Sequence, residues 1–122
     1  METWLFFKMD EFEKGESIGR TVVLKEGTTI LDTDDFDTIE VVVFNWLHRV
    51  AGTYSLAAGT VTLVDPTTSG QIFFVVPSAT SSSIRAMKYF YRIKTTETDG
   101  DYPTGIRTRI YLGWCFKLKA TK

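Results

Sequence analysis

Apolar and polar residues alternate along most of this chain, which is the pattern of a β-strand with one buried face. In the longest run, residues 106–119, one face carries Ile110, Leu112, Trp114 and Phe116, and the other face carries mainly Arg and Lys with Tyr111. Helical spacing would mix these two sets, so the pattern disfavours a helix. A run of fourteen residues is long for one strand, and we expect a bend or bulge near Gly113.

Turn residues predict two hairpins. Residues 87–94 also alternate, and the Asp-Gly, Pro and Gly of residues 96–105 join them to the final run as an antiparallel neighbour. Residues 60–64 and 71–76 flank Asp65–Gly70, where Pro66 and Gly70 indicate a turn. The small polar residues 78–83 predict a crossover loop or a short helical turn.

Three further segments are predicted strands: residues 21–24, 39–46 and 48–56, of which 39–46 is apolar enough to be buried on both faces. About seven strands therefore follow residue 20, separated by turn signals roughly every 8–12 residues. This spacing predicts an all-β domain, either a β-sandwich or a small barrel. The length of 122 residues fits one domain, with the sandwich over residues 20–122.

Residues 1–19 read as an N-terminal arm or added strand, because they combine large apolar side chains with acidic ones. We predict that Trp4, Phe6 and Phe7 bury against a neighbouring chain, whose Arg107 and Arg109 meet the acidic residues of the arm. The alternative is that the arm folds back as a strand on its own domain.

The charge is small overall but uneven along the chain. The formal net charge is −1, yet residues 1–61 hold five Lys or Arg and eleven Asp or Glu, whereas residues 62–122 hold nine and four. The two halves either interleave and pair their charges internally, or dock an acidic end on a basic end of a neighbour. The small net charge predicts no nucleic acid and no membrane as partner.

Cysteine content and hydropathy add little to this picture. The lone Cys115 cannot form an internal disulfide and lies in an apolar run, so we expect a small core or interface residue. No apolar stretch reaches the ~18 residues of a transmembrane helix. The first residues lack the basic region and cleavage site of a signal peptide.

Candidate chemistry is sparse. His48 is the only histidine, so a Ser-His-Asp or Cys-His mechanism has to use it, and no nucleophile motif accompanies it. The aspartates of residues 32–37 resemble calcium ligands but lack the Gly and distal Glu of an EF-hand loop, which favours a solvated acidic turn. We therefore predict a protein that is not an enzyme, with no catalytic residue, no cofactor and no metal site.

The tryptophans keep a binding function open. Most large aromatic side chains are expected to fill the core between sheets. If Trp4, Trp46 and Trp114 are instead coplanar and exposed, a small carbohydrate- or receptor-binding module is favoured, with a surface glycan as partner. If they are buried or lie at subunit contacts, assembly is favoured.

The succession of segments resembles a known family. An acidic loop at Leu31–Asp35 leads into the strand Ile39–Phe44, the hairpin Val61-Thr-Leu-Val-Asp-Pro-Thr-Thr-Ser-Gly-Gln-Ile72, a crossover and the Tyr-rich strand Met87–Ile93. This resembles the immunoglobulin-like domains of phage virion proteins, especially the N-terminal domain of the upper baseplate protein of lactococcal-type phages. The resemblance covers about residues 18–120, and the arm is not part of it.

The resemblance implies an immunoglobulin-like antiparallel β-sandwich of about seven to nine strands. It also implies a non-enzymatic structural protein of a phage or phage-like virion, in a tail, baseplate, head-to-tail junction or capsid decoration. Its partners would be other virion proteins and copies of itself. Its location would be the virion, after assembly in the host cytoplasm.

Overall fold

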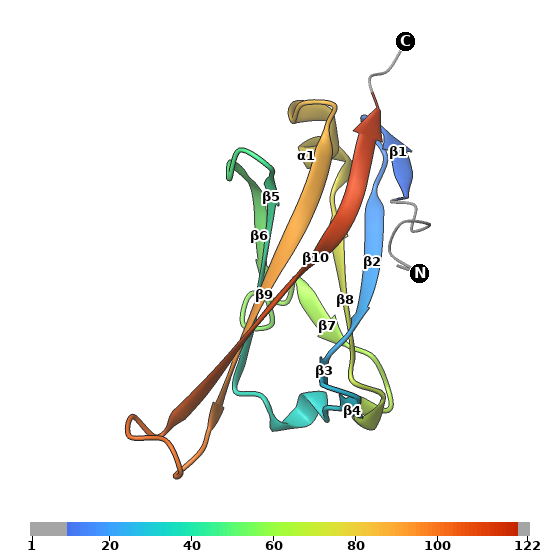
Figure 1. Ribbon diagram of the computed structural model, residues 1–122. Coiled ribbons are helices and arrows are strands. Elements are labelled where there is room, and N and C mark those ends of the chain that lie inside the picture. Colours follow the sequence, from blue (N-terminus) through green and yellow to red (C-terminus); the bar gives the residue numbers. More distant parts are fainter. Residues whose placement is uncertain (1–9, 120–122) are drawn as a thin grey trace, which may run out of the picture.

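Ten strands in three sheets make up most of residues 10–119, the part of the chain that the computed structural model describes (Figure 1). The largest sheet consists, in spatial order, of β1 (Glu11–Glu13), β10 (Ile106–Lys119), β9 (Lys88–Thr98), β5 (Thr38–Asn45) and β6 (Val50–Ser55). A second sheet consists of β2 (Ile18–Val23), β8 (Gln71–Val76) and β7 (Val61–Leu63). A small ribbon pairs β3 (Lys25–Glu26) with β4 (Thr29–Ile30).

The mostly β prediction is confirmed, with 55% strand and one short helix. That helix is α1 (Ser78–Ser83), at the predicted crossover, and its six residues are too few to span a bilayer. Both predicted hairpins are present, because β7 pairs antiparallel with β8 and β9 with β10. The largest sheet is mixed, since β1 runs parallel to β10.

The two larger sheets share one hydrophobic core. Alternate residues of each strand point into it, such as Val41 of β5, Ile93 of β9 and Ile18 of β2. The rings of Tyr54 on β6 and Phe74 on β8 stack at 5.8 Å between centroids, which joins the two sheets directly. The side of the five-stranded sheet that faces away from this core is called the outer face below.

A bulge in β10 decides which of its residues enter the core. The register with β9 shifts between Trp114 and Phe116, close to the bend expected near Gly113. The extra residue, Cys115, and the following Phe116 are both fully buried. The shift reverses the strand's facing, so that the apolar residues before the bulge point outward and those after it point inward.

Part of the predicted arm lies on its own domain. Strand β1 pairs with the end of β10, and Phe12 packs edge-on against Phe116 with ring centroids 6.4 Å apart. Ile18 is already a core residue, and Asp10 forms an ion pair with Arg20 at 2.6 Å. Residues 10–19 therefore fold back on their own domain, which is the alternative to an arm that contacts a neighbouring chain.

Candidate functional site

An open apolar groove crosses the outer face of the five-stranded sheet. It has a volume of about 690 Å³ and draws its lining from β5, β6, β9, β10 and the β5–β6 turn. Its lining residues are Val42, Phe44, Trp46, His48, Val50, Phe90, Tyr91, Arg92, Leu112, Gly113 and Trp114.

A row of aromatic rings runs across the groove. His48 stacks on Phe44 with their ring centroids 5.8 Å apart. The ring centroids of Phe44 and Phe90 are 6.1 Å apart, and those of Phe90 and Trp114 are 5.0 Å apart. The sheet register creates this row, since Phe44 lies opposite Phe90 and Phe90 opposite Trp114. Lys88 ends the row with its Nζ 5.8 Å from the Trp114 ring, a cation–π contact.

The turn between β5 and β6 holds one end of the groove in place. The buried Asn45 accepts hydrogen bonds through Oδ1 from the backbone N–H groups of Leu47 and Arg49, at 2.9 and 3.0 Å. His48 adopts a left-handed backbone conformation with φ 62° and donates its N–H to the Asn45 carbonyl. These bonds fix the turn that presents Trp46 and His48 to the groove.

The expectation that most large aromatic side chains lie in the core is wrong for two tryptophans. Trp46 is 63% exposed and Trp114 is 50% exposed, while Leu112, which lines the same groove, is 71% exposed. The β10 bulge explains Trp114 and Leu112, because it turns the strand's first apolar stretch away from the core. Trp4 lies outside the described residues, as do Phe6 and Phe7, and their predicted contacts stay predictions.

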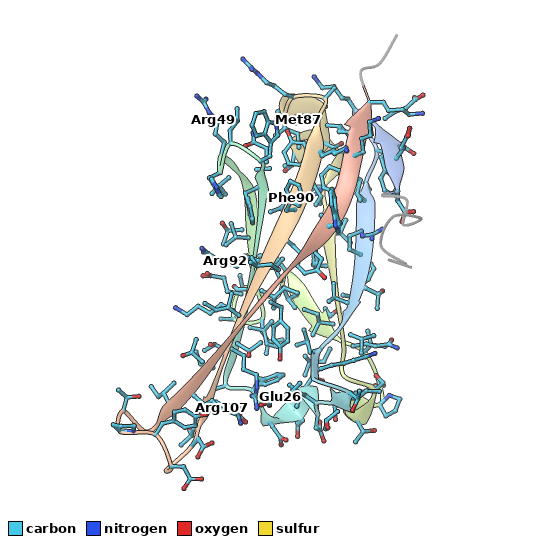
Figure 2. The ribbon with its side chains drawn as sticks, in the orientation of Figure 1. Glu26, Arg49, Met87, Phe90, Arg92 and Arg107 are labelled. Atoms are coloured by element: carbon cyan, nitrogen blue, oxygen red, sulfur yellow. The ribbon has the colours of Figure 1, made fainter. Side chains whose placement is uncertain are left out.

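Two polar groups accompany the apolar lining. Arg92 lies between Val42 and Leu112 in the sheet register and projects from β9 beside Phe90 (Figure 2). Tyr91 lies between Phe90 and Arg92 and packs its ring against the core, where burial raises the pKa of its phenol. The groove therefore offers a broad apolar contact, the Arg92 guanidinium and the His48 imidazole, which suits binding better than bond cleavage.

The candidate catalytic residues are not brought together. His48 lies on the outer face, stacked on Phe44, whereas Cys115 lies on the core side. Burial raises the pKa of the Cys115 thiol to about 12, so the thiolate nucleophile does not form at neutral pH. Asp32 caps a short turn by accepting from the Asp34 N–H, and within residues 10–119 no three metal-ligating side chains converge.

The predicted assembly contacts Arg107 and Arg109 take part in ion pairs within the chain. Both guanidinium groups bond the Glu26 carboxylate, and Arg109 also bonds Glu97. Arg107 and Glu26 lie together at the lower end of the molecule in Figure 2. The two pairs with Glu26 and that of Lys119 with Glu11 join the acidic first half to the basic second half, as the internal-pairing interpretation expects.

This ion cluster predicts an acid-dependent effect of Glu26→Gln. Hydrogen bonds from Arg109 and Arg107 lower the pKa of Glu26 below its ordinary value of 4.5. A carboxyl whose pKa is lowered by folding stabilises the protein above its unfolded pKa and loses that effect as the pH falls through the folded pKa. Urea unfolding should therefore show Glu26→Gln less stable than wild type at pH 7, with the difference shrinking towards pH 3. Glu13→Gln is the matched control, and an undiminished Glu26→Gln difference at pH 3 would contradict the prediction.

Sequence reasoning missed the centre of the groove, namely Phe44, Phe90 and Leu112. One signal was present, because Phe90 shares a strand face with Lys88, Arg92 and Lys94. A large aromatic residue on an otherwise charged face indicates an exposed contact site.

Comparison with known proteins adds no relative. No family model matches the chain, and no curated protein is significantly similar to it.

Proposed function

We propose that this chain is a non-enzymatic structural subunit that assembles through the apolar groove of its outer face. The observation that carries the proposal is the row of large apolar side chains left in solvent around Trp46, Leu112 and Trp114. Monomeric proteins rarely expose contiguous apolar patches beyond a few hundred Å², and larger patches mark contact sites.

The composition of the groove supports a protein partner. Tryptophan and arginine dominate the energetics of protein interfaces, and here Arg92 lies among Trp114, Phe90 and Leu112. Burying these side chains removes apolar area from water, at about 25 cal/mol per Å² before the costs of association. The rigid sheet behind them limits the entropy that binding costs.

The finer proposal is an immunoglobulin-like sandwich domain of a phage or phage-like virion protein. It rests on the resemblance of residues 18–120 and is supported by two sheets around a common core with antiparallel hairpins in the expected places. On this proposal the groove contacts copies of the chain and other virion proteins, with neither nucleic acid nor membrane as partner.

Leu112→Glu tests the proposal because it places a charge in the middle of the groove without touching the core. We expect the wild-type protein to self-associate in sedimentation velocity over about 1–100 μM. Leu112→Glu should weaken association at least tenfold, because the desolvation of a buried carboxylate exceeds its attraction to Arg92 on the neighbouring strand. The melting temperature should change little, because Leu112 is exposed.

Val75→Glu is the matched control, since Val75 is an exposed apolar residue on the other sheet. This variant should associate like wild type. A wild-type protein that stays monomeric throughout this range, or a Leu112→Glu variant that associates normally, would contradict assembly through the groove.

A carbohydrate-binding module is the second candidate, because two exposed tryptophans line one groove. Sugars need hydrogen-bond partners as well as aromatic faces, and this lining has no carboxylate and no carboxamide. A glycan array should therefore show no binding. Binding that Trp114→Ala abolishes would favour this second function.

A further inference from the structure

The hairpin of β9 and β10 projects from the body of the molecule. Strand β5 pairs with β9 only as far as Thr96, so within residues 10–119 the last residues of β9 and the first residues of β10 pair only with each other. Figure 1 shows this end of the hairpin standing away from the other strands. Its loop, residues 99–105, is called the hairpin tip below.

Contacts at both ends of the projecting part hold it in one conformation. At its base, the Glu26 carboxylate on β3 forms an ion pair with Arg107 on β10. Within the tip, the Asp99 N–H donates to the Gly105 carbonyl at 2.9 Å, and the Gly105 N–H donates to the Tyr102 carbonyl at 2.8 Å. A loop that is ordered in advance loses less conformational entropy when it binds a partner.

The hairpin tip combines apolar surface with negative charge. Tyr102 is 40% exposed, and Ile106, the first residue of β10, is 51% exposed. The tip carries the carboxylates of Asp99 and Asp101 and contains no lysine, arginine or histidine. A surface that binds the tip therefore has to offer an apolar contact together with positive charge.

The groove on the outer face has this complementary character. Arg92 is part of its lining, and Lys88 lies over the Trp114 ring with its Nζ 5.8 Å from the centroid. Arg49 is exposed in the β5–β6 turn, which forms one end of the groove. Within residues 10–119 none of these three cations forms an ion pair, and no carboxylate is among the described residues that line the groove. The groove thus suits an apolar element that carries carboxylates.

The groove and the hairpin tip of one molecule lie too far apart to meet. From Phe90, in the groove, to Thr98, beside the tip, β9 runs about 26 Å. The hairpin also continues in the direction away from the groove (Figure 1). A contact between these two surfaces therefore joins two molecules.

We propose that the hairpin tip of one molecule binds in the groove of a second copy. This inference rests on the proposed function, since it names the surface that the groove binds. In this contact Tyr102 packs on the aromatic row, and Asp99 and Asp101 lie near the cations of the groove. A two-fold contact of groove with groove would instead bring the cations of both molecules together, which disfavours it. Because two different surfaces meet, the association is head-to-tail and produces a ring or an open filament.

Two variants, each blocked at one of the two surfaces, test the contact. Leu112→Glu blocks the groove and leaves the tip intact, whereas Asp101→Lys combined with Tyr102→Ala blocks the tip and leaves the groove intact. In sedimentation velocity, each variant alone should associate at least about tenfold more weakly than wild type. A mixture of the two should form a heterodimer and no larger species, because one functional groove and one functional tip remain. A mixture that associates no more strongly than the separate variants would overturn the proposal.

Asp34→Lys is the matched control, because it makes the same change of charge at an exposed residue that lies at this end of the molecule but outside the hairpin. It should associate like wild type, and an effect equal to that of the tip variant would overturn the proposal. Asp101 and Tyr102 are exposed, so the tip variant should keep the melting temperature of wild type.

The same measurements separate this inference from the proposed function. A tip variant that associates like wild type, while Leu112→Glu is defective, would overturn the hairpin contact and leave assembly through the groove in place. A Leu112→Glu variant that associates normally would contradict assembly through the groove itself.

Discussion

Phe116→Ala should lower the free energy of unfolding by about 3–5 kcal/mol, the usual cost of deleting a buried aromatic side chain. Phe116 is fully buried, stacks on Tyr89 with centroids 5.0 Å apart and meets Phe12 edge-on at 6.4 Å. Alanine would leave a cavity between these rings that the rigid sheets cannot close. Chemical denaturation monitored by circular dichroism measures the loss.

Leu112→Ala is the control, on the same strand but before the bulge. Because Leu112 is 71% exposed, we expect its replacement to cost less than about 0.5 kcal/mol in the monomer. A pattern continued without the bulge would place both residues on one face. Similar costs for the two substitutions would therefore contradict the reversed facing of β10.

Gly70→Ala should be the second strongly destabilising substitution, at about 2–4 kcal/mol. Gly70 has φ 69°, a left-handed conformation that side chains disfavour. An added Cβ would lie 2.6 Å from Cγ2 of Ile30 and 2.9 Å from the Leu31 carbonyl oxygen. The Gly70 carbonyl also accepts the Leu24 N–H at 2.7 Å, so a shift would loosen the link between β2 and the β7–β8 hairpin.

Gly105→Ala separates the cost of the left-handed backbone conformation from the cost of the steric clash. Gly105 has φ 74° but nothing within 4 Å of an added Cβ, so it carries the backbone strain without the clash. We expect it to cost about 1–2 kcal/mol, less than Gly70→Ala. Thermal melts of both variants check the order, and equal losses would show that steric crowding at Gly70 is unimportant.

Local patterns predicted the strands and the helical turn well, because these elements are determined by residues that are close together in the sequence. The strand over residues 71–76, the strand over 106–119 and the helical turn over 78–83 have the predicted bounds. Pro66 with Gly70, and Asp99 with Gly100, indicated both hairpins, since turn conformations depend on the residues that form them.

The groove could not be predicted in the same way. Its lining comes from four strands and a turn, and Phe44, Phe90 and Trp114 become neighbours only through strand pairing. Alternation shows that the two faces of a strand differ, but it does not show which face meets the core. A single bulge reverses which face of the following residues points inward.

The sequence by itself determined a mostly β chain, its hairpins and the scarcity of catalytic groups, because alternation, turn residues and residue types are local properties. Only the tertiary structure decided that β1 lies on its own domain, that Arg107 and Arg109 bond Glu26, and that Trp46 and Trp114 are exposed. These outcomes depend on pairing between residues far apart in the chain. The free energy of such pairing depends on register and burial in the complete fold, which no local pattern encodes.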